Sequence, residues 1–251
     1  MAIWNDPQPT DRKVGTGFGA SPSVAVPSVG RTTFDAGLRR HMLSIYNYMA
    51  SGVLLSGIVA MLFASSGAAA QVMGSGLGIV VMLAPLAFVL VMSFGINKLS
   101  TTALQACFWG FAVVMGLSLS TIFLVYTGAS VAATFFATAG AFAGLSLYGY
   151  TTQRSLTGMG SFLIMGVVGI IIASLINMFL QSPGLYWAVS ILGVLIFAGL
   201  TAYDTQKLKE QYQFVRGTDM AGKVVVMGAL NLYLDFINMF MYLLRFMGDR
   251  R

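Results

Sequence analysis

Seven long apolar runs follow one another along this chain, and they determine the class of fold that it can adopt. About 20 consecutive apolar residues are enough for an α-helix to cross the hydrocarbon core of a bilayer. The runs cover residues 42–63, 77–96, 102–126, 131–150, 161–180, 185–206 and 224–246. Short connections separate them, so neighbouring helices should be antiparallel. We therefore predict an all-α polytopic membrane protein whose seven helices form one compact bundle.

The amino-acid composition supports this class over a soluble protein or a β-barrel. Charged residues make up 9% of the chain and hydrophobic residues 57%, whereas soluble domains carry about 25% charged residues. So few charges cannot cover the surface of a soluble fold. Outer-membrane barrels alternate apolar and polar residues over segments of about 10, but the runs here are continuous.

The first 37 residues differ from the rest of the chain. They contain four of the six prolines, with many Gly, Ser and Thr, and they show no hydrophobic period. No apolar stretch of the kind found in signal peptides precedes Met42. We predict that residues 1–37 form a disordered tail and that residues 38–251 form the transmembrane domain.

The distribution of basic residues indicates an orientation in the membrane. The connections 64–76, 127–130 and 181–184 carry no Lys or Arg. The connections on the other side of the membrane carry Lys98, Arg154, Lys207, Lys209, Arg216 and Lys223. Because Lys and Arg accumulate on the cytoplasmic side, we expect the N-terminus in the cytoplasm. The net charge of +6 then reflects orientation in a lipid bilayer, and no nucleic-acid partner is expected.

The last run is an exception to this charge rule. Seven full spans place Arg245, Arg250 and Arg251 on the side that is otherwise free of basic residues. The alternative is that the last run enters the membrane without crossing it. Because the run is long enough to span and a final span obeys the charge rule weakly, we expect a full crossing.

Several kinds of chemistry find no support in the sequence. Cys107 is the single cysteine and His41 the single histidine, so there is no internal disulfide and no zinc, haem or iron–sulfur spacing. We expect His41, beside Arg39 and Arg40, to lie at the membrane surface. No Gly-rich phosphate loop and no Ser/His/Asp set occurs, and we expect neither a cofactor nor an enzymatic activity. The Gly140-x-x-x-Gly144 spacing predicts close helix packing inside the bundle.

Asp235 lies in the middle of the last apolar run, within residues 227–245. A carboxylate at the centre of a membrane helix costs roughly 2.5–3.5 kcal/mol on insertion scales. It must therefore find a partner in the protein or face a water-filled path. One interpretation is a structural Asp that hydrogen-bonds to Asn231, Asn238 or Tyr233.

Asp204 is the one other carboxylate at a comparable depth. If its helix continues to about Glu210, Asp204 lies about 9 Å inside that end, at 1.5 Å per residue. If the last helix becomes embedded near Met227, Asp235 lies about 12 Å inside, so adjacent antiparallel helices allow contact. If they meet, the two groups should share a proton and titrate as a pair, and their oxygens suit a hard cation such as Ca²⁺. The alternative is that Asp204 pairs with Lys207 or Lys209 in water.

The segments around these two acids carry a family resemblance. Leu232-Tyr-Leu-Asp235-Phe-Ile-Asn238 and Tyr203-Asp204-Thr-Gln206 closely resemble the last two spans of the Bax inhibitor-1 family. The resemblance implies a seven-helix bundle in the bacterial inner membrane, with the last helix central. It also implies a pH-sensitive calcium leak channel whose sensor is the hydrogen-bonded pair Asp204 and Asp235, with Ca²⁺ as a transient ligand.

The resemblance also sets expectations for the neighbours of the pair. Family members carry an arginine near the end of the second span that can hold an aspartate, but no arginine is present there in this chain. Lys98 is the nearest basic residue, and a lysine lacks the bidentate fork of an arginine. We expect the latch or the surroundings of the pair to be formed by Lys98, Tyr203, Tyr233, Asn231 and Asn238.

Other functions compete with the leak channel. Some bacterial relatives resemble modulators of a membrane-anchored ATP-dependent protease, and the polar tail offers a contact for such a partner. A secondary transporter is expected to have inverted repeats or broken helices, which the sequence does not show clearly. An intramembrane aspartyl protease is disfavoured because neither Asp204 nor Asp235 lies in a Gly-x-Gly-Asp context.

Overall fold

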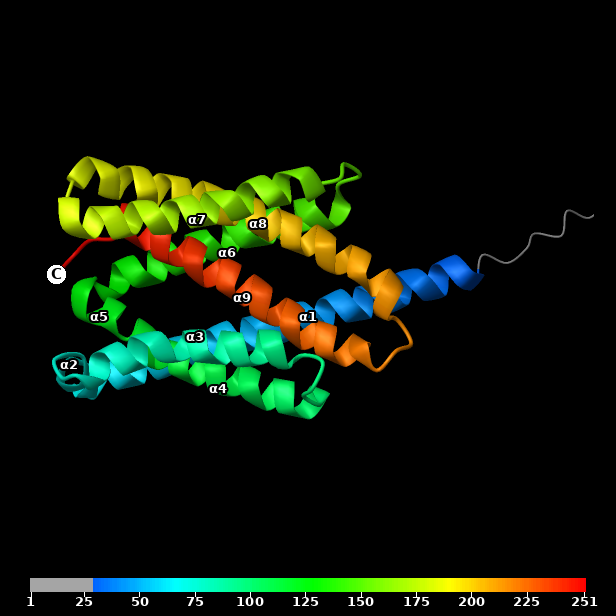
Figure 1. Cartoon of the computed structure of the whole chain (residues 1–251), viewed down its shortest axis with the longest axis horizontal. Coiled ribbons are helices and arrows are strands. Elements are labelled where there is room, and N and C mark those ends of the chain that lie inside the picture. Colours follow the sequence, from blue (N-terminus) through cyan, green and yellow to red (C-terminus); the bar gives the residue numbers. More distant parts are fainter. Residues whose placement is uncertain (1–28) are drawn as a thin grey trace, which may run out of the picture.

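The computed structural model describes the backbone of residues 29–251 and the side chains from Ala36 onward. The named elements of this part are all helices (Figure 1). In chain order they are α1 (Val29–Ser65), α2 (Ala68–Met73), α3 (Leu77–Gly95), α4 (Thr101–Leu119), α5 (Thr121–Val125), α6 (Gly128–Thr151), α7 (Thr157–Leu180), α8 (Pro183–Val215) and α9 (Met220–Met247). Within the described residues, seven segments are long and apolar enough to cross a membrane, with α4 and α5 acting as one. The predicted all-α polytopic fold is confirmed.

The structure corrects one predicted boundary and shows a break inside one predicted span. Helix α1 begins at Val29, so residues 29–37 extend the first helix and do not belong to the tail. A helix that has left the hydrocarbon no longer needs an apolar face, so this extension leaves no hydrophobic period to detect. The disorder predicted for residues 1–28 lies outside the described residues and stays a prediction. The third run divides at the buried Ser120, whose hydroxyl donates to the Leu117 carbonyl at 2.6 Å.

Helix α9 is the centre of the bundle. In its most apolar window 61% of the residues are buried, against 11–39% for the other six spans. It packs against α1, α4, α6 and α8, and it runs obliquely between the α7–α8 pair and the α3–α4 pair (Figure 1). The resemblance implied a central last helix, and the fold agrees with it. The peripheral helices α3 and α7 contact the bundle mainly through α4 and α8.

Glycines set the closest approaches between these helices. A Cβ on Gly149 of α6 would collide with the backbone carbonyl of Ala202 on α8, and one on Gly193 of α8 would collide with the ring of Tyr242 on α9. The prediction for Gly140 and Gly144 is wrong, because no described atom lies within 4 Å of a Cβ built at either position. That pair lies on the outward face of α6, so it does not mediate packing inside the bundle.

The two ends of the bundle differ in charge. We call the end with the α3–α4, α6–α7 and α8–α9 connections the basic end, because Lys98, Arg154 and Arg216 lie there. At this end Nζ of Lys223, in the first turn of α9, donates to the Ile96 carbonyl at 3.0 Å. Helix α9 finishes at the opposite end, so it spans the bundle from end to end, as a full crossing requires.

The last three residues tie the end of α9 to the α5–α6 connection. The Thr127 amide donates to the Asp249 carbonyl at 3.1 Å, and the Arg251 amide donates to the Val125 carbonyl at 2.9 Å. The Asp249 amide donates to Ser130 Oγ at 2.9 Å. These bonds form a short antiparallel bridge that we call the C-terminal strap, residues 249–251. The strap fixes the position of α9 at the end of the bundle opposite the basic end.

Candidate functional site

The motif Tyr203–Gln206 on α8 is held by three neighbouring segments. The Gln206 side chain accepts from the Leu156 amide at 2.7 Å and donates to the Arg154 carbonyl at 2.8 Å, so it clamps the α6–α7 connection. Thr205 donates to Ser146 Oγ on α6 at 3.4 Å. The ring of Tyr203 lies against Gly160 on α7. These contacts fix the rotation of α8 about its axis.

With α8 fixed in this way, Asp204 lies on the side of the helix that packs against α9. Leu208 lies one turn later on the same face of α8. Its side chain packs against Gly228 of α9 and so forms part of the α8–α9 contact. Asp204 itself is half-buried. The cation whose charge acts on it is Lys207, which is exposed on the same helix. Lys207 was one of the partners considered from the sequence, but no ion pair joins the two side chains.

Asp235 is the buried member of the pair. It is 5% exposed, and its Oδ2 has no hydrogen-bond partner among the described residues. Of the titratable side chains on the helices packed around α9, Asp204 is the one whose charge acts on it. No hydrogen bond joins the two carboxyl groups in this structure. The two acids are therefore electrostatic neighbours, whereas the resemblance implied a hydrogen-bonded pair.

The other residues considered as partners of Asp235 have different contacts. Tyr233 is fully buried, and its hydroxyl lies 2.7 Å from Ser56 Oγ. Ser56 donates its proton to the Ala112 carbonyl at 2.6 Å, so Tyr233 is the donor to Ser56. Asn238 Nδ2 donates to the Leu234 carbonyl of its own helix at 2.8 Å. Neither these residues nor the half-buried Asn231 hydrogen-bonds to Asp235.

Lys98 does not reach the pair. It is exposed in the α3–α4 connection, and the structure gives its side chain no contact with Asp204 or Asp235. The lysines that point into the basic end are Lys223, described above, and Lys209, whose Nζ donates to the Tyr150 carbonyl at 2.8 Å. Each neutralises the carbonyl end of a helix, α3 or α6. We missed both roles because α8 and α9 extend beyond their apolar runs.

The two acids alone do not complete the ligand shell of a bound calcium ion. Ca²⁺ takes six to eight oxygen ligands. In the described part of the chain no cluster of three or more His, Cys, Asp or Glu side chains exists. Two carboxylates supply only part of such a shell, so water has to complete it.

Two further features were not expected from the sequence. The hydroxyl of Tyr46 on α1 lies near Thr205 and Ser146, and Thr205 donates to Ser146 Oγ, so side chains of three helices meet in one hydroxyl cluster beside Asp204. Hydroxyl residues are common in membrane helices, so no spacing distinguished these three. His41, which we expected at the membrane surface, is instead buried at 7% exposure against the ring of Tyr212.

Known proteins resemble the chain over nearly its whole length. The family model described as inhibitor of apoptosis-promoting Bax1 matches residues 38–251. The inner membrane protein YbhL of Escherichia coli K12 is 46% identical over 222 residues, which cover 86% of this chain and 94% of YbhL. RP147 of Rickettsia prowazekii is 48% identical over 221 residues, which cover 87% of this chain and 93% of RP147. The chain therefore belongs to the Bax inhibitor-1 family of membrane proteins.

Proposed function

We propose that this protein is a pH-sensitive leak channel for calcium in the bacterial inner membrane, and that Asp204 and Asp235 form its proton-sharing sensor. The observation that carries the proposal is the environment of Asp235. Its Oδ2 is buried in a membrane helix and has no hydrogen-bond partner among the described residues, and the neighbouring charge is a second carboxylate. Intramembrane acids of this kind mark ion pathways and proton relays.

The direction of the pH response follows from the charges of the pair. While the pair holds a proton, at most one negative charge lies between α8 and α9, and the dry packing around Asp235 is tolerated. Loss of that proton leaves two like charges in a poorly solvated site, which repel each other. Hydration or an entering cation relieves this repulsion, and either event loosens the α8–α9 contact. The calcium flux should therefore rise as the pH rises.

The location follows from the relatives and from the charge pattern. YbhL is an inner membrane protein, and the basic end carries the connections that favour the cytoplasm. We place the basic end and the N-terminus in the cytoplasm, with the C-terminal strap on the outer face. Asp204 then lies in the cytoplasmic half of α8, and Asp235 lies near the middle of α9, so we expect the pair to respond to the internal pH.

A flux assay in liposomes tests the proposal. The purified chain is reconstituted into liposomes that contain a calcium-sensitive dye. The dye response is followed at a fixed external calcium concentration while the pH is stepped from about 5.5 to about 8.5, roughly the range of biological pH switches. We expect the calcium flux to increase with pH in the wild type. Asp204→Asn and Asp235→Asn should each flatten this response, because one remaining carboxylate has no like charge to repel.

Asp219→Asn is the matched control. It removes the same charge from an exposed position at the start of α9, and its pH response should equal that of the wild type. Flux no greater than in protein-free liposomes at every pH contradicts the channel proposal. That result favours instead a membrane-embedded modulator of a protease or of another membrane protein.

A further inference from the structure

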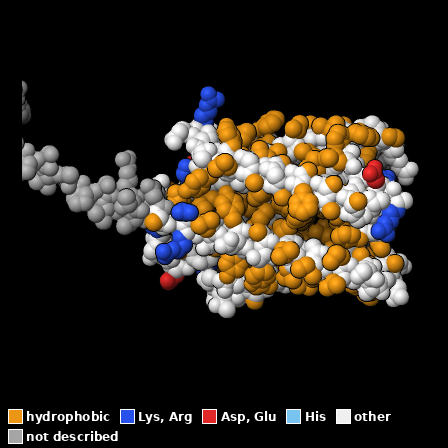
Figure 2. Space-filling view, turned by 180° about the vertical axis from the view of Figure 1, so that it is seen from behind, with side chains coloured by type: hydrophobic (Ala, Val, Ile, Leu, Met, Phe, Trp, Pro, Cys, Tyr) orange, Lys and Arg blue, Asp and Glu red, His pale blue; other side chains and the backbone are white. Residues whose placement is uncertain are grey.

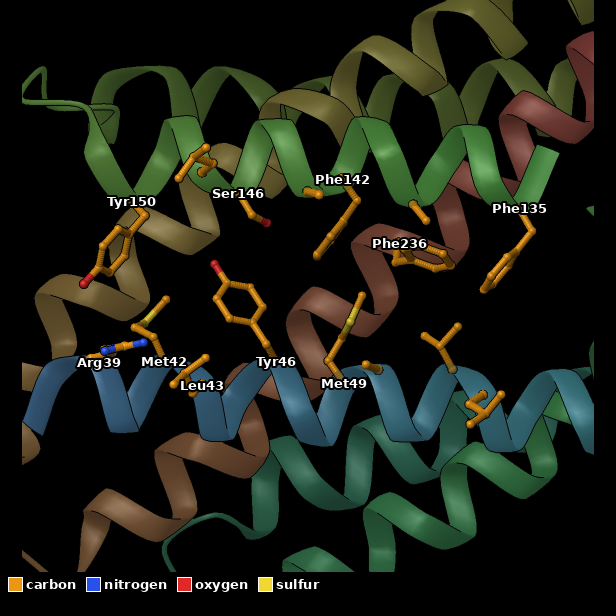
Figure 3. Close-up of a pocket in the computed structure, with 16 residues that line it drawn as sticks. Arg39, Met42, Leu43, Tyr46, Met49, Phe135, Phe142, Ser146, Tyr150 and Phe236 are labelled. Atoms are coloured by element: carbon orange, nitrogen blue, oxygen red, sulfur yellow. The ribbon is translucent and has the colours of Figure 1, made fainter. Parts of the chain in front are cut away.

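A lateral cleft separates α1 from α6 on the outside of the bundle. Both helices pack against α9, but they hardly touch each other. The space between them is a cavity of about 640 Å³ whose floor includes Phe236 of α9. Its labelled side chains point into the gap from both helices (Figure 3). From behind, a hollow lined by hydrophobic side chains runs along the middle of the molecule (Figure 2).

The two ends of this cavity differ in chemistry. Arg39 and Tyr150 line it at the basic end, and the remainder is mainly apolar, down to Leu54 and Phe135. The exposed guanidinium of Arg39 has no hydrogen bond or ion pair with the described residues. Lys209 adds a second positive charge, with its Nζ 5.3 Å from the ring centroid of Tyr150. No carboxylate is among the described residues that line the cavity.

The length and the lining of the cavity fit an acyl chain. Arg39 and Leu54 are about 22 Å apart along α1 at 1.5 Å per residue, which exceeds the ~15 Å of hydrocarbon in one leaflet. Apolar side chains from both helices line most of that length. One extended hydrocarbon chain therefore finds apolar contacts along the cavity, and its headgroup comes level with Arg39.

We propose that the α1–α6 cleft is a binding site for an anionic phospholipid of the leaflet at the basic end. One acyl chain lies along the apolar part of the cleft between Phe142 and Met49. The phosphate accepts from Arg39, whose planar guanidinium can donate two parallel hydrogen bonds to it, and from the hydroxyl of Tyr150. The rim residues Leu43 and Leu147 are exposed, so the lipid enters sideways from the bilayer.

A second cavity serves as an internal comparison. It continues the cleft toward the opposite end, with a volume of about 390 Å³, and shares Val53, Phe135 and Phe236 with the first. No charged side chain is among the described residues that line it. The second cavity therefore gives an acyl chain the same apolar walls without a partner for a phosphate. The proposed headgroup selectivity belongs to the first cavity alone.

Native mass spectrometry tests the headgroup site. The full chain is released from detergent to which phosphatidylglycerol or phosphatidylcholine has been added. We expect the wild type to retain phosphatidylglycerol in preference to phosphatidylcholine. Arg39→Gln should weaken phosphatidylglycerol binding roughly fivefold or more, the effect of removing one basic residue near a lipid phosphate. Arg40→Gln removes the adjacent exposed arginine, which does not line the cavity, and should bind as the wild type does.

A second pair of variants tests the acyl-chain part. Ala143 lines the cavity, whereas Ala141 is equally exposed on α6 but does not line it. Ala143→Trp should therefore lower lipid retention, and Ala141→Trp should leave it unchanged. If Ala143→Trp fails to fold, the two arginine variants still decide the question.

Three results overturn the proposal. One is an equal loss of phosphatidylglycerol in Arg39→Gln and Arg40→Gln, which indicates attraction to the whole basic end. Another is equal retention of the two lipids by the wild type. The third is a dimer that Ala143→Trp disrupts, which identifies a second copy of the chain as the occupant.

Discussion

At the residue scale, Asp235 differs from its neighbours Tyr233 and Asn238 on α9 in lacking a hydrogen-bond partner. Tyr233 is bonded to Ser56, and Asn238 is bonded to the backbone of its own helix. The Oδ2 of Asp235 has no partner among the described residues. A buried polar atom without a hydrogen bond costs about 1–3 kcal/mol, and more when it is charged. A residue that is destabilising for the fold in this way is a natural place for a switch.

The contacts of Tyr233 give a prediction that separates structure from sensing. Tyr233 lies two positions from Asp235, on a different face of α9, where its hydroxyl donates to Ser56. Tyr233→Phe should lower the unfolding free energy by about 1 kcal/mol, measured by denaturant titration in detergent. The pH response of calcium flux should stay unchanged. A flattened response in Tyr233→Phe would show that Tyr233 belongs to the sensor.

The clamp formed by Gln206 gives a second prediction. Gln206→Ala removes both bonds to the α6–α7 connection and leaves the buried amide of Leu156 without a partner. We expect a loss of about 1–3 kcal/mol in unfolding free energy. Gln213→Ala, at an exposed position on the same helix, is the control and should change the stability by less than about 0.5 kcal/mol. Equal stability of the two variants contradicts the clamp.

At the element scale, close approaches between helices and a few hydrogen bonds hold the bundle together. The bundle has no water to exclude between its helices within the bilayer, so small residues and hydrogen bonds determine which faces meet. Gly149 brings α6 against the α8 backbone, and Ser56 links α1 to both α4 and α9. The pair proposed as the sensor belongs to α8 and α9, so its geometry depends on how closely α8 packs against α6.

Two glycines of α6 provide a matched test of the close packing between α6 and α8. Alanine favours a helix over glycine by about 1 kcal/mol. At Gly144, where no described atom is near, Gly144→Ala should therefore maintain or raise the melting temperature. At Gly149 the added Cβ meets the backbone of Ala202, and Gly149→Ala should lower it. The same sign of change for both variants would contradict the close contact between α6 and α8.

At the scale of the whole molecule, the class of fold was predictable from the sequence, but few side-chain contacts were. Seven spans were predictable because each apolar run must cross the same hydrocarbon thickness. The start of α1 at Val29 was not predictable, because polar helical extensions leave no periodic pattern. The contacts of Gln206 and Lys223 depend on which helix ends meet in space. These contacts form between segments that are far apart in the sequence, so the local pattern of one apolar run does not predict them.

The C-terminal strap gives a prediction about the molecule as a whole. Removing residues 249–251 deletes the acceptor for the Thr127 amide and the donor to the Val125 carbonyl. We expect faster hydrogen–deuterium exchange in the peptide that contains Thr127, because its amide loses its partner. The connection 152–156, at the opposite end of the bundle, should exchange as before. Unchanged exchange at Thr127 would show that the strap does not hold the α5–α6 connection.

The central claim is that Asp204 and Asp235 act as one unit, and a double-mutant cycle of calcium flux against pH tests it most directly. The change in flux between low and high pH is measured in liposomes for the wild type, Asp204→Asn, Asp235→Asn and the double variant. Residues that act as a unit give strongly non-additive effects. We predict that each single variant loses the pH response and that the double variant loses no more. Independent, additive losses from the two substitutions would contradict the account.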